Sequence, residues 1–166
     1  MATQVEALLA EFDKEAKATR RMLERLPDGK GDWKPHPKSM SLGRLAMHLA
    51  EIPGTFTSIL DRDERVVDGP PTTPRVAANA ADALATFDAN TAKFAETLAS
   101  FPDFRLGETW RFRVGGRVAL EAPRAVAIRA LLLSHSIHHR GQLSVYLRLL
   151  DVAVPGSYGP SADEKR

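Results

Sequence analysis

Residues 123–150 read PRAVAIRALLLSHSIHHRGQLSVYLRLL, and this stretch decides the fold. Pro123 suits the first turn of a helix, where no intrahelical partner exists for the N–H that proline lacks. Apolar side chains then recur on one face at helical spacing, together with two histidines: Ile128, Leu132, His135, His139, Leu143, Tyr146 and Leu150. The stretch therefore predicts one long helix whose main face packs in a protein core.

The two histidines lie in the centre of that face. His135 and His139 are four residues apart, so on a helix they lie one turn apart on the same side. Two imidazoles at this spacing can share one metal ion. Alternatively, they are buried histidines that hydrogen bond to the backbone or to water, and the pair alone leaves both interpretations open. His138 points away from this face, so we leave it out of the site.

Three further segments have apolar residues at alternating spacings of three and four, as in the helices of a bundle. They are residues 3–26, 41–61 and 79–100. Thr3 and Glu6 fit a capping box at the start of the first segment, in which each side chain binds the backbone N–H of the other residue.

The expected fold is all-α, a four-helix bundle that forms a single domain over residues 1–166. The helical period gives way to a strand-like pattern at residues 108–121, where apolar and polar side chains alternate around Gly115-Gly116. This pattern predicts a small β-hairpin with a tight turn, attached to the bundle just before the last long helix. Residues 61–78 are expected to be a surface connection.

The composition excludes several classes of site. The chain has no cysteine, so it has no disulfide, no thiolate metal ligand and no cysteine nucleophile. Any metal ion must be bound by His, Asp or Glu, which suits zinc, nickel or iron. The formal net charge is only +2 and the basic residues are scattered, which argues against nucleic acid as a partner. No run of about 18 apolar residues occurs, so we expect no membrane contact and a cytoplasmic location.

His48 is the candidate for a third ligand. It lies on the edge of the apolar face of the second expected helix, three residues after Leu45 and four before Ile52. If this helix is a neighbour of the last one, the imidazoles of His48, His135 and His139 can converge. Three neutral nitrogens with one open coordination position are typical of a catalytic metal site, and a metal ion there can activate water.

Five other residues are candidates for a second shell or for the walls of a pocket. Glu51 follows the second-helix histidine by one turn and can orient a ligand or accept a proton, although a glutamate there is often only solvated. Arg140 can recognise an anionic substrate, but we favour a surface or interface ion pair. Gln142 flanks the histidine pair. Trp110 and Tyr158 can either wall a pocket or pack in the core.

Three blocks of sequence resemble the DinB-like family, which lies within the wider DinB/YfiT-like superfamily. They are residues 32–43, which lead into His48, residues 135–143, and residues 154–161. The second block is the most specific of the three. Together with the spacing between them, the blocks cover nearly the whole chain.

The resemblance implies a four-helix bundle, often dimeric, with a divalent metal ion held by three histidines. The ligand positions correspond to His48, His135 and His139. Some members of the superfamily resemble enzymes that use a small thiol for transfer or isomerisation, and others resemble hydrolases. The resemblance thus implies metal binding more directly than it implies any one reaction.

Three functions are consistent with these features. A metal-dependent enzyme, of hydrolase or thiol-dependent transferase type, would activate water or a small thiol. Its small-molecule substrate would lie between the second and last helices, under residues 28–40 or 152–161. A non-enzymatic protein would bind the metal ion in a stress response, and a structural homodimer would contain buried histidines and no metal. A second stripe on the last helix comprises Val126, Leu133, Ile137 and Ser144. It must pack against another surface, which favours a homodimer, although another helix of the same chain could also cover it.

Overall fold

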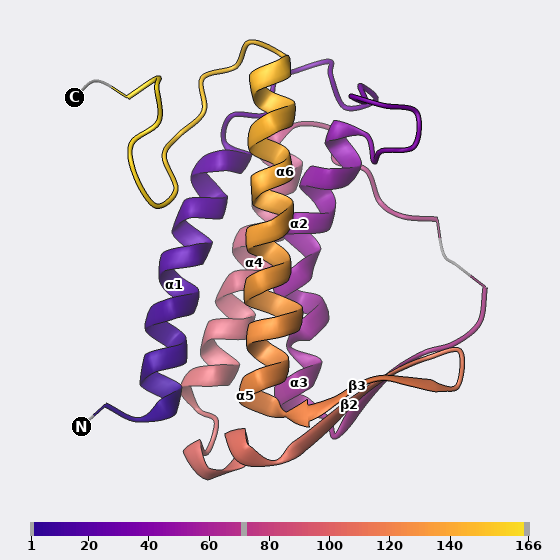
Figure 1. Ribbon diagram of the computed structural model, residues 1–166, viewed down its shortest axis with the longest axis vertical. Helices are drawn as coiled ribbons and strands as arrows, with labels where there is room; N and C mark the ends of the chain where they lie inside the picture. The colour runs from indigo at the N-terminus through magenta and orange to yellow at the C-terminus, as the bar shows by residue number, and fades with distance from the viewer. Residues whose placement is uncertain (1, 71–72, 165–166) are drawn as a thin grey trace.

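Four long helices lie side by side in the computed structural model, which describes residues 2–70 and 73–164 (Figure 1). They are α1 (Gln4–Leu23), α2 (Leu42–Phe56), α4 (Ala80–Ala99) and α6 (His135–Leu149). Each of α1 and α2 contacts both α4 and α6. The chain is therefore mostly helical, and α2 and α6 are the neighbours that a shared histidine site requires.

All four helices contribute to one apolar core. Completely buried examples are Leu8 of α1, Leu49 of α2, Phe94 of α4 and Leu143 of α6. The predicted capping box starts α1, where the Thr3 hydroxyl accepts from the Glu6 N–H and the Glu6 carboxylate accepts from the Thr3 N–H. Of the helices in the described part of the chain, none is long and apolar enough to span a membrane.

The segment expected to form one helix over residues 41–61 is divided in two. α2 ends at Phe56, and the short α3 (Ser58–Asp61) follows it. Pro53 lies inside α2, where it lacks the N–H that would bond to the preceding turn. The break comes one turn later, at Thr57, whose N–H and hydroxyl both donate to the Pro53 carbonyl oxygen.

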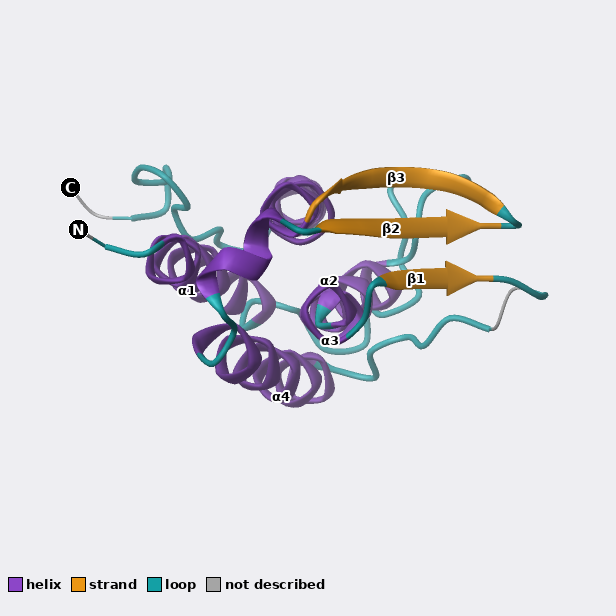
Figure 2. Ribbon diagram, turned by 90° about the horizontal axis from the view of Figure 1, so that it is seen from below, coloured by secondary structure: helices purple, strands orange, loops and turns teal. Residues whose placement is uncertain are grey.

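A small sheet extends from one side of the helices (Figure 2). β2 (Thr109–Val114) and β3 (Arg117–Pro123) form the predicted hairpin, whose turn contains Gly115 and Gly116, both at positive φ. A third strand, β1 (Glu64–Val67), pairs with β2 in parallel. The prediction of a plain surface connection before α4 was therefore wrong at these residues, because a strand of four residues is too short to show a clear alternation.

The last helix is not uniform along its length. α5 (Arg124–Ala127) continues through a π-helical segment, Ile128–Ser134, which ends directly before His135 and α6. The wider π turn rotates the residues that follow it relative to a regular α-helix. The second apolar stripe that we expected is consequently not one continuous face, since Leu133 is buried whereas Val126 is half exposed.

Candidate metal centre

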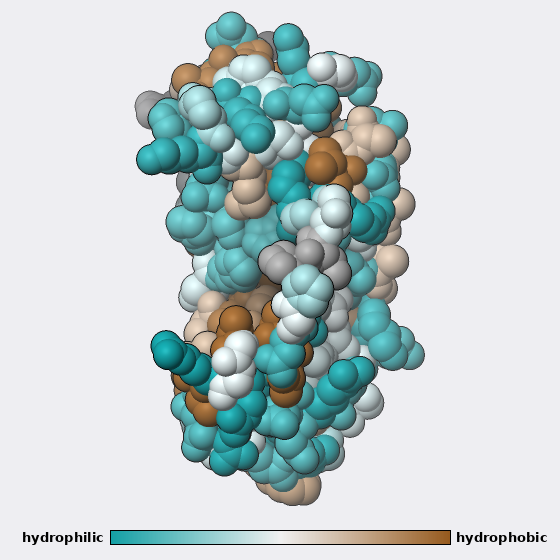
Figure 3. Space-filling view, turned by 90° about the vertical axis from the view of Figure 1, so that its right-hand side faces the viewer, coloured by the Kyte–Doolittle hydropathy of each residue, from teal (hydrophilic) through white to brown (hydrophobic). Residues whose placement is uncertain are grey.

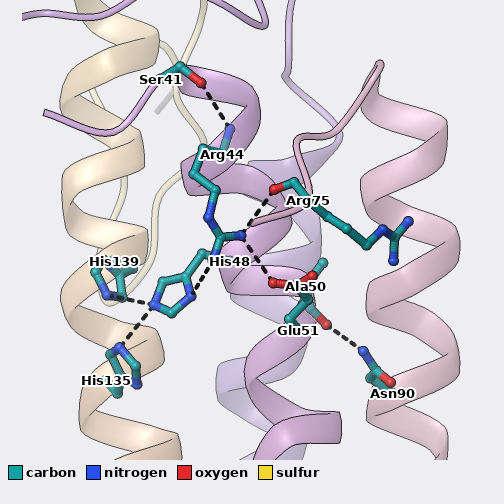
Figure 4. A network of polar contacts seen from close by, with 9 residues as sticks. All are labelled: Ser41, Arg44, His48, Ala50, Glu51, Arg75, Asn90, His135 and His139. Atoms are coloured by element: carbon teal, nitrogen blue, oxygen red, sulfur yellow. Dashed lines mark hydrogen bonds and ion pairs between the residues drawn. The ribbon is translucent and has the colours of Figure 1, made fainter. Parts of the chain in front are cut away.

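The packing of α2 against α6 brings three histidine side chains together. His48 points from α2 towards His135 and His139 on α6 (Figure 4). Its Nε2 atom lies 3.1 Å from the Nε2 atoms of both. The potential ligand atoms of the three residues all lie within 4.8 Å of one another, so this group could hold a metal ion.

Hydrogen bonds on the far side of two of these rings determine which nitrogen carries the proton. The Nδ1 atom of His135 lies 3.2 Å from the Leu131 carbonyl oxygen, and that of His139 lies 2.7 Å from Gln142 Oε1. Because a carbonyl oxygen only accepts, each Nδ1–H donates and each Nε2 keeps its lone pair. The lone pairs of both residues therefore point into the cluster, as metal binding requires.

His48 has a different partner, Arg44, which we did not identify from the sequence. The Arg44 guanidinium lies 3.4 Å from His48 Nδ1 and donates a 3.0 Å hydrogen bond to the Glu51 carboxylate. Glu51 therefore acts on the histidine through Arg44 and is itself neutralised by it. The spacing of Arg44, His48 and Glu51 along α2, four residues and then three, was a signal that they share one helix face.

Burial keeps the three imidazoles neutral. The pKa of His48 is lowered to about 4, mainly by desolvation and then by the neighbouring His139, His135 and Arg44. Burial also lowers the pKa values of His135 and His139, although the hydrogen bonds from their Nδ1 atoms oppose this effect. Neutral imidazole is the form that ligates metals, so the cluster presents this form at neutral pH.

Three of the candidate pocket residues make their described contacts away from the three histidines. Arg140 was expected at the surface or at an interface, but it is buried and bonds to the Glu15 carboxylate at 2.7 Å and to the Tyr158 hydroxyl at 2.9 Å. Tyr158 also donates to Glu15, which holds the C-terminal loop against α1. Trp110 is completely buried and stacks on Phe112. Among the described contacts, none joins Arg140, Tyr158 or Trp110 to the three histidines.

The remaining predictions concern Gln142 and His138. Gln142, placed only loosely by the sequence, bonds directly to the ring of His139. His138 is exposed and contacts the edge of the His139 ring, with ring centroids 4.9 Å apart. The structure thus separates it from the convergent group, as its position on the helix predicted.

Comparison with known proteins gives one consistent relationship. A family model described as the DinB family matches residues 1–166. The protein described as "Uncharacterized protein YrdA" from Bacillus subtilis (strain 168) is 28% identical over 156 residues, which cover 94% of this chain and 89% of that protein.

Two solved structures are similar over almost their whole length. A DinB-like protein from Bacillus cereus ATCC 10987 has a TM-score of 0.73 and 25% identity, covering 95% of this chain and 100% of that one. The DinB-like protein YjoA from Bacillus subtilis has a TM-score of 0.68 and 18% identity, covering 91% and 96%. The second similarity concerns the fold alone.

Proposed function

We propose that this chain, which belongs to the DinB family, binds a divalent metal ion through the Nε2 atoms of His48, His135 and His139. The observation that carries the proposal is the orientation of the two α6 rings, whose Nδ1–H groups donate to Leu131 and Gln142. Both Nε2 lone pairs are thereby aimed at one point beside His48. An all-nitrogen donor set without thiolates suits zinc, nickel or iron.

We further propose that the chain is one domain, residues 1–166, with α1, α2, α4 and α6 as a four-helix bundle. A homodimer is supported by Val145 and Leu149, which lie four residues apart on α6 and are both more than half exposed. Sedimentation at several protein concentrations tests this. A single monomeric species throughout would contradict it.

The reaction class that fits best is hydrolysis or transfer to a small thiol. A bound divalent ion would lower the pKa of water or of a thiol and so supply the nucleophile. The residues of the chain itself orient the ligand rings: Leu131 and Gln142 hold the two α6 imidazoles, and Arg44, fixed by Glu51, contacts the third. The oriented ligand rings therefore support an enzyme. Its substrate would be a small molecule.

One observation favours a second candidate, a structural cluster without metal. A guanidinium only donates hydrogen bonds, so Arg44 faces a lone pair on His48 Nδ1. The proton of neutral His48 then lies on Nε2 and can donate to His135 or His139 across 3.1 Å. In this state one of the two α6 histidines accepts the His48 proton, and metal binding requires that proton to leave Nε2.

Metal analysis of protein purified without a histidine tag distinguishes the two candidates. We expect close to one zinc, nickel or iron per chain after loading, and a sharp loss in His139→Ala because one of three nitrogens is removed. His138→Ala is the matched control, since it removes the adjacent exposed imidazole and should bind metal like the parent. Less than about 0.1 metal per chain with no uptake of added ions, or equal uptake by His139→Ala, would overturn the proposal.

Activity separates an enzyme from a protein that senses or stores the ion. Ester hydrolysis or thiol transfer that requires the metal, and that disappears in His139→Ala but not in His138→Ala, supports the enzyme. Stoichiometric metal binding without turnover across these substrate classes supports the non-enzymatic role.

A further inference from the structure

An open pocket of about 400 Å³ lies between α2, α4 and the segment that joins α3 to α4. Its lining includes Glu51 and Thr55 of α2, Arg65 of β1, and Thr86 and Asn90 of α4. The side of the molecule on which this segment runs is hollowed, and mostly hydrophilic side chains lie in the middle of that face (Figure 3).

Arg65 is the unusual residue of this pocket. The other described arginines that are buried or half-buried each form an ion pair with a carboxylate; they are Arg44, Arg105, Arg111, Arg113, Arg124 and Arg140. Arg65 is also half-buried, but among the described residues it contacts no carboxylate, and its one hydrogen bond is a 3.4 Å contact with the Thr55 carbonyl oxygen. A charge withdrawn from water without a counter-ion is costly, so such groups normally have a partner.

Burial acts on the Arg65 guanidinium in the direction expected for a cation without a counter-ion. Its pKa is lowered from the usual value, mainly by desolvation and secondarily by the positive charge of Arg62. The guanidinium remains protonated at any physiological pH. A bound anion would relieve this unfavourable environment.

The neighbouring charges in the pocket are already paired. Glu51 accepts a 3.0 Å bond from Arg44, and Arg75 lies 3.4 Å from the Asp82 carboxylate. One positive charge, that of Arg65, is therefore left over. The hydroxyls of Thr55 and Thr86 also line the pocket, as does Asn90, whose amide donates a 2.8 Å hydrogen bond to the Ala50 carbonyl oxygen.

The position along α2 relates this pocket to the histidines. Glu51 and Thr55 lie three and seven residues beyond His48, which corresponds to about 5 Å and about 10 Å along a helix axis. Glu51 is also joined to His48 through Arg44 (Figure 4). The Thr55 carbonyl oxygen that Arg65 contacts thus lies about 10 Å from His48 along the α2 axis.

We propose that Arg65 binds the anionic group, a carboxylate or a phosphate, of a small molecule whose other end lies at His48, His135 and His139. A guanidinium presents paired donors that match both anions. The link to the histidines rests on the proposed metal-binding function, whereas the anion site itself does not require a metal ion.

The test uses full-length protein treated with chelator, titrated separately with inorganic phosphate and with acetate at constant ionic strength. Proton–nitrogen NMR follows the Arg65 Nε–H and the backbone amides of Thr86 and Asn90. We expect saturable shifts with at least one anion and a rise of about tenfold or more in its Kd in Arg65→Gln, since a charge-assisted bond is lost. Arg117→Gln is the matched control, because Arg117 is exposed on the same sheet and the change in net charge is identical.

The outcomes are separable. Saturation by phosphate alone or by acetate alone supports the site and identifies the anion class, and partial recovery in Arg65→Lys supports a charge requirement in a folded variant. Absence of saturation, an unchanged Kd in Arg65→Gln, or an equal rise in Arg117→Gln would overturn the anion site. Anion binding without metal uptake would refute only the proposed function, and metal uptake without anion binding would refute only this inference.

Discussion

The hydrogen bond between Gln142 and His139 offers a sharp test of how the cluster is built. The Gln142 amide oxygen lies 2.7 Å from His139 Nδ1 and holds the proton there, so Nε2 stays free. Gln142→Leu keeps the approximate volume of the side chain but removes the acceptor. Loss of such a partner typically weakens metal binding by about 10- to 100-fold.

The structure places the expected effect near the lower end of that range. Gln142 is half-buried rather than enclosed, so water can replace part of the lost bond. We expect Kd to rise about tenfold, equivalent to about 1.4 kcal/mol. The assay is competition with a chromophoric chelator for zinc at pH 7.5, with circular dichroism to confirm that each variant is folded.

Gln142→Glu is the matched control because it keeps an acceptor at the same distance. Because the new carboxylate still accepts the His139 Nδ1–H bond, the Gln142→Glu variant should bind zinc at least as tightly as the parent protein does. The reasoning would be refuted if Gln142→Leu had the affinity of the parent, or if Gln142→Glu lost as much affinity as Gln142→Leu.

Three further predictions concern stability. Arg140→Met should lower the free energy of unfolding by about 3–5 kcal/mol in urea denaturation, because the buried Glu15 carboxylate loses its partner; adding Glu15→Leu should recover part of the loss, and no recovery would contradict a charge effect. Gly54→Ala should cost about 1–3 kcal/mol by the same measurement, since the new Cβ would overlap the Asn90 side chain, and an unchanged midpoint would show that α2 and α4 adjust freely. Metal-free protein should lose stability as the pH falls from about 6.5 towards 4, because the unfolded chain takes up a proton that folded His48, with its pKa at about 4, does not. After allowance for solvent screening, the free energy of unfolding should fall by about 1–2 kcal/mol between pH 7.5 and pH 5. Urea denaturation at the two pH values measures this difference, which should be smaller in His48→Gln.

The parts of the site that the sequence predicted all depend on local helical geometry. His135 and His139 lie one turn apart, and the edge position of His48 follows from its spacing to Leu45 and Ile52. These relations hold on any regular helix. The convergence of the three rings required in addition that α2 and α6 be neighbours, which the structure shows.

The parts that the sequence did not predict depend on contacts between distant segments. Arg140 looked like a surface residue until the fold placed Glu15, 125 positions earlier, against it. β1 exists because β2 lies beside it, and its own four residues have too little pattern to predict it. Arg65 likewise differs from the other half-buried arginines only because the fold places a carboxylate beside each of them.

By itself, the sequence determined the helical class, the hairpin turn, the capping box at Thr3, the absence of thiolate ligands and the two-histidine face of residues 135–139. These features are set by spacing, turn chemistry and composition, all of which act within a few residues. The tertiary structure alone decided which nitrogens face the cluster, which charges are paired, and which half-buried arginine lines an open pocket without a carboxylate partner. Hydrogen-bond partners and counter-ions are chosen by distance in space, and folding brings together atoms that the order of residues keeps far apart.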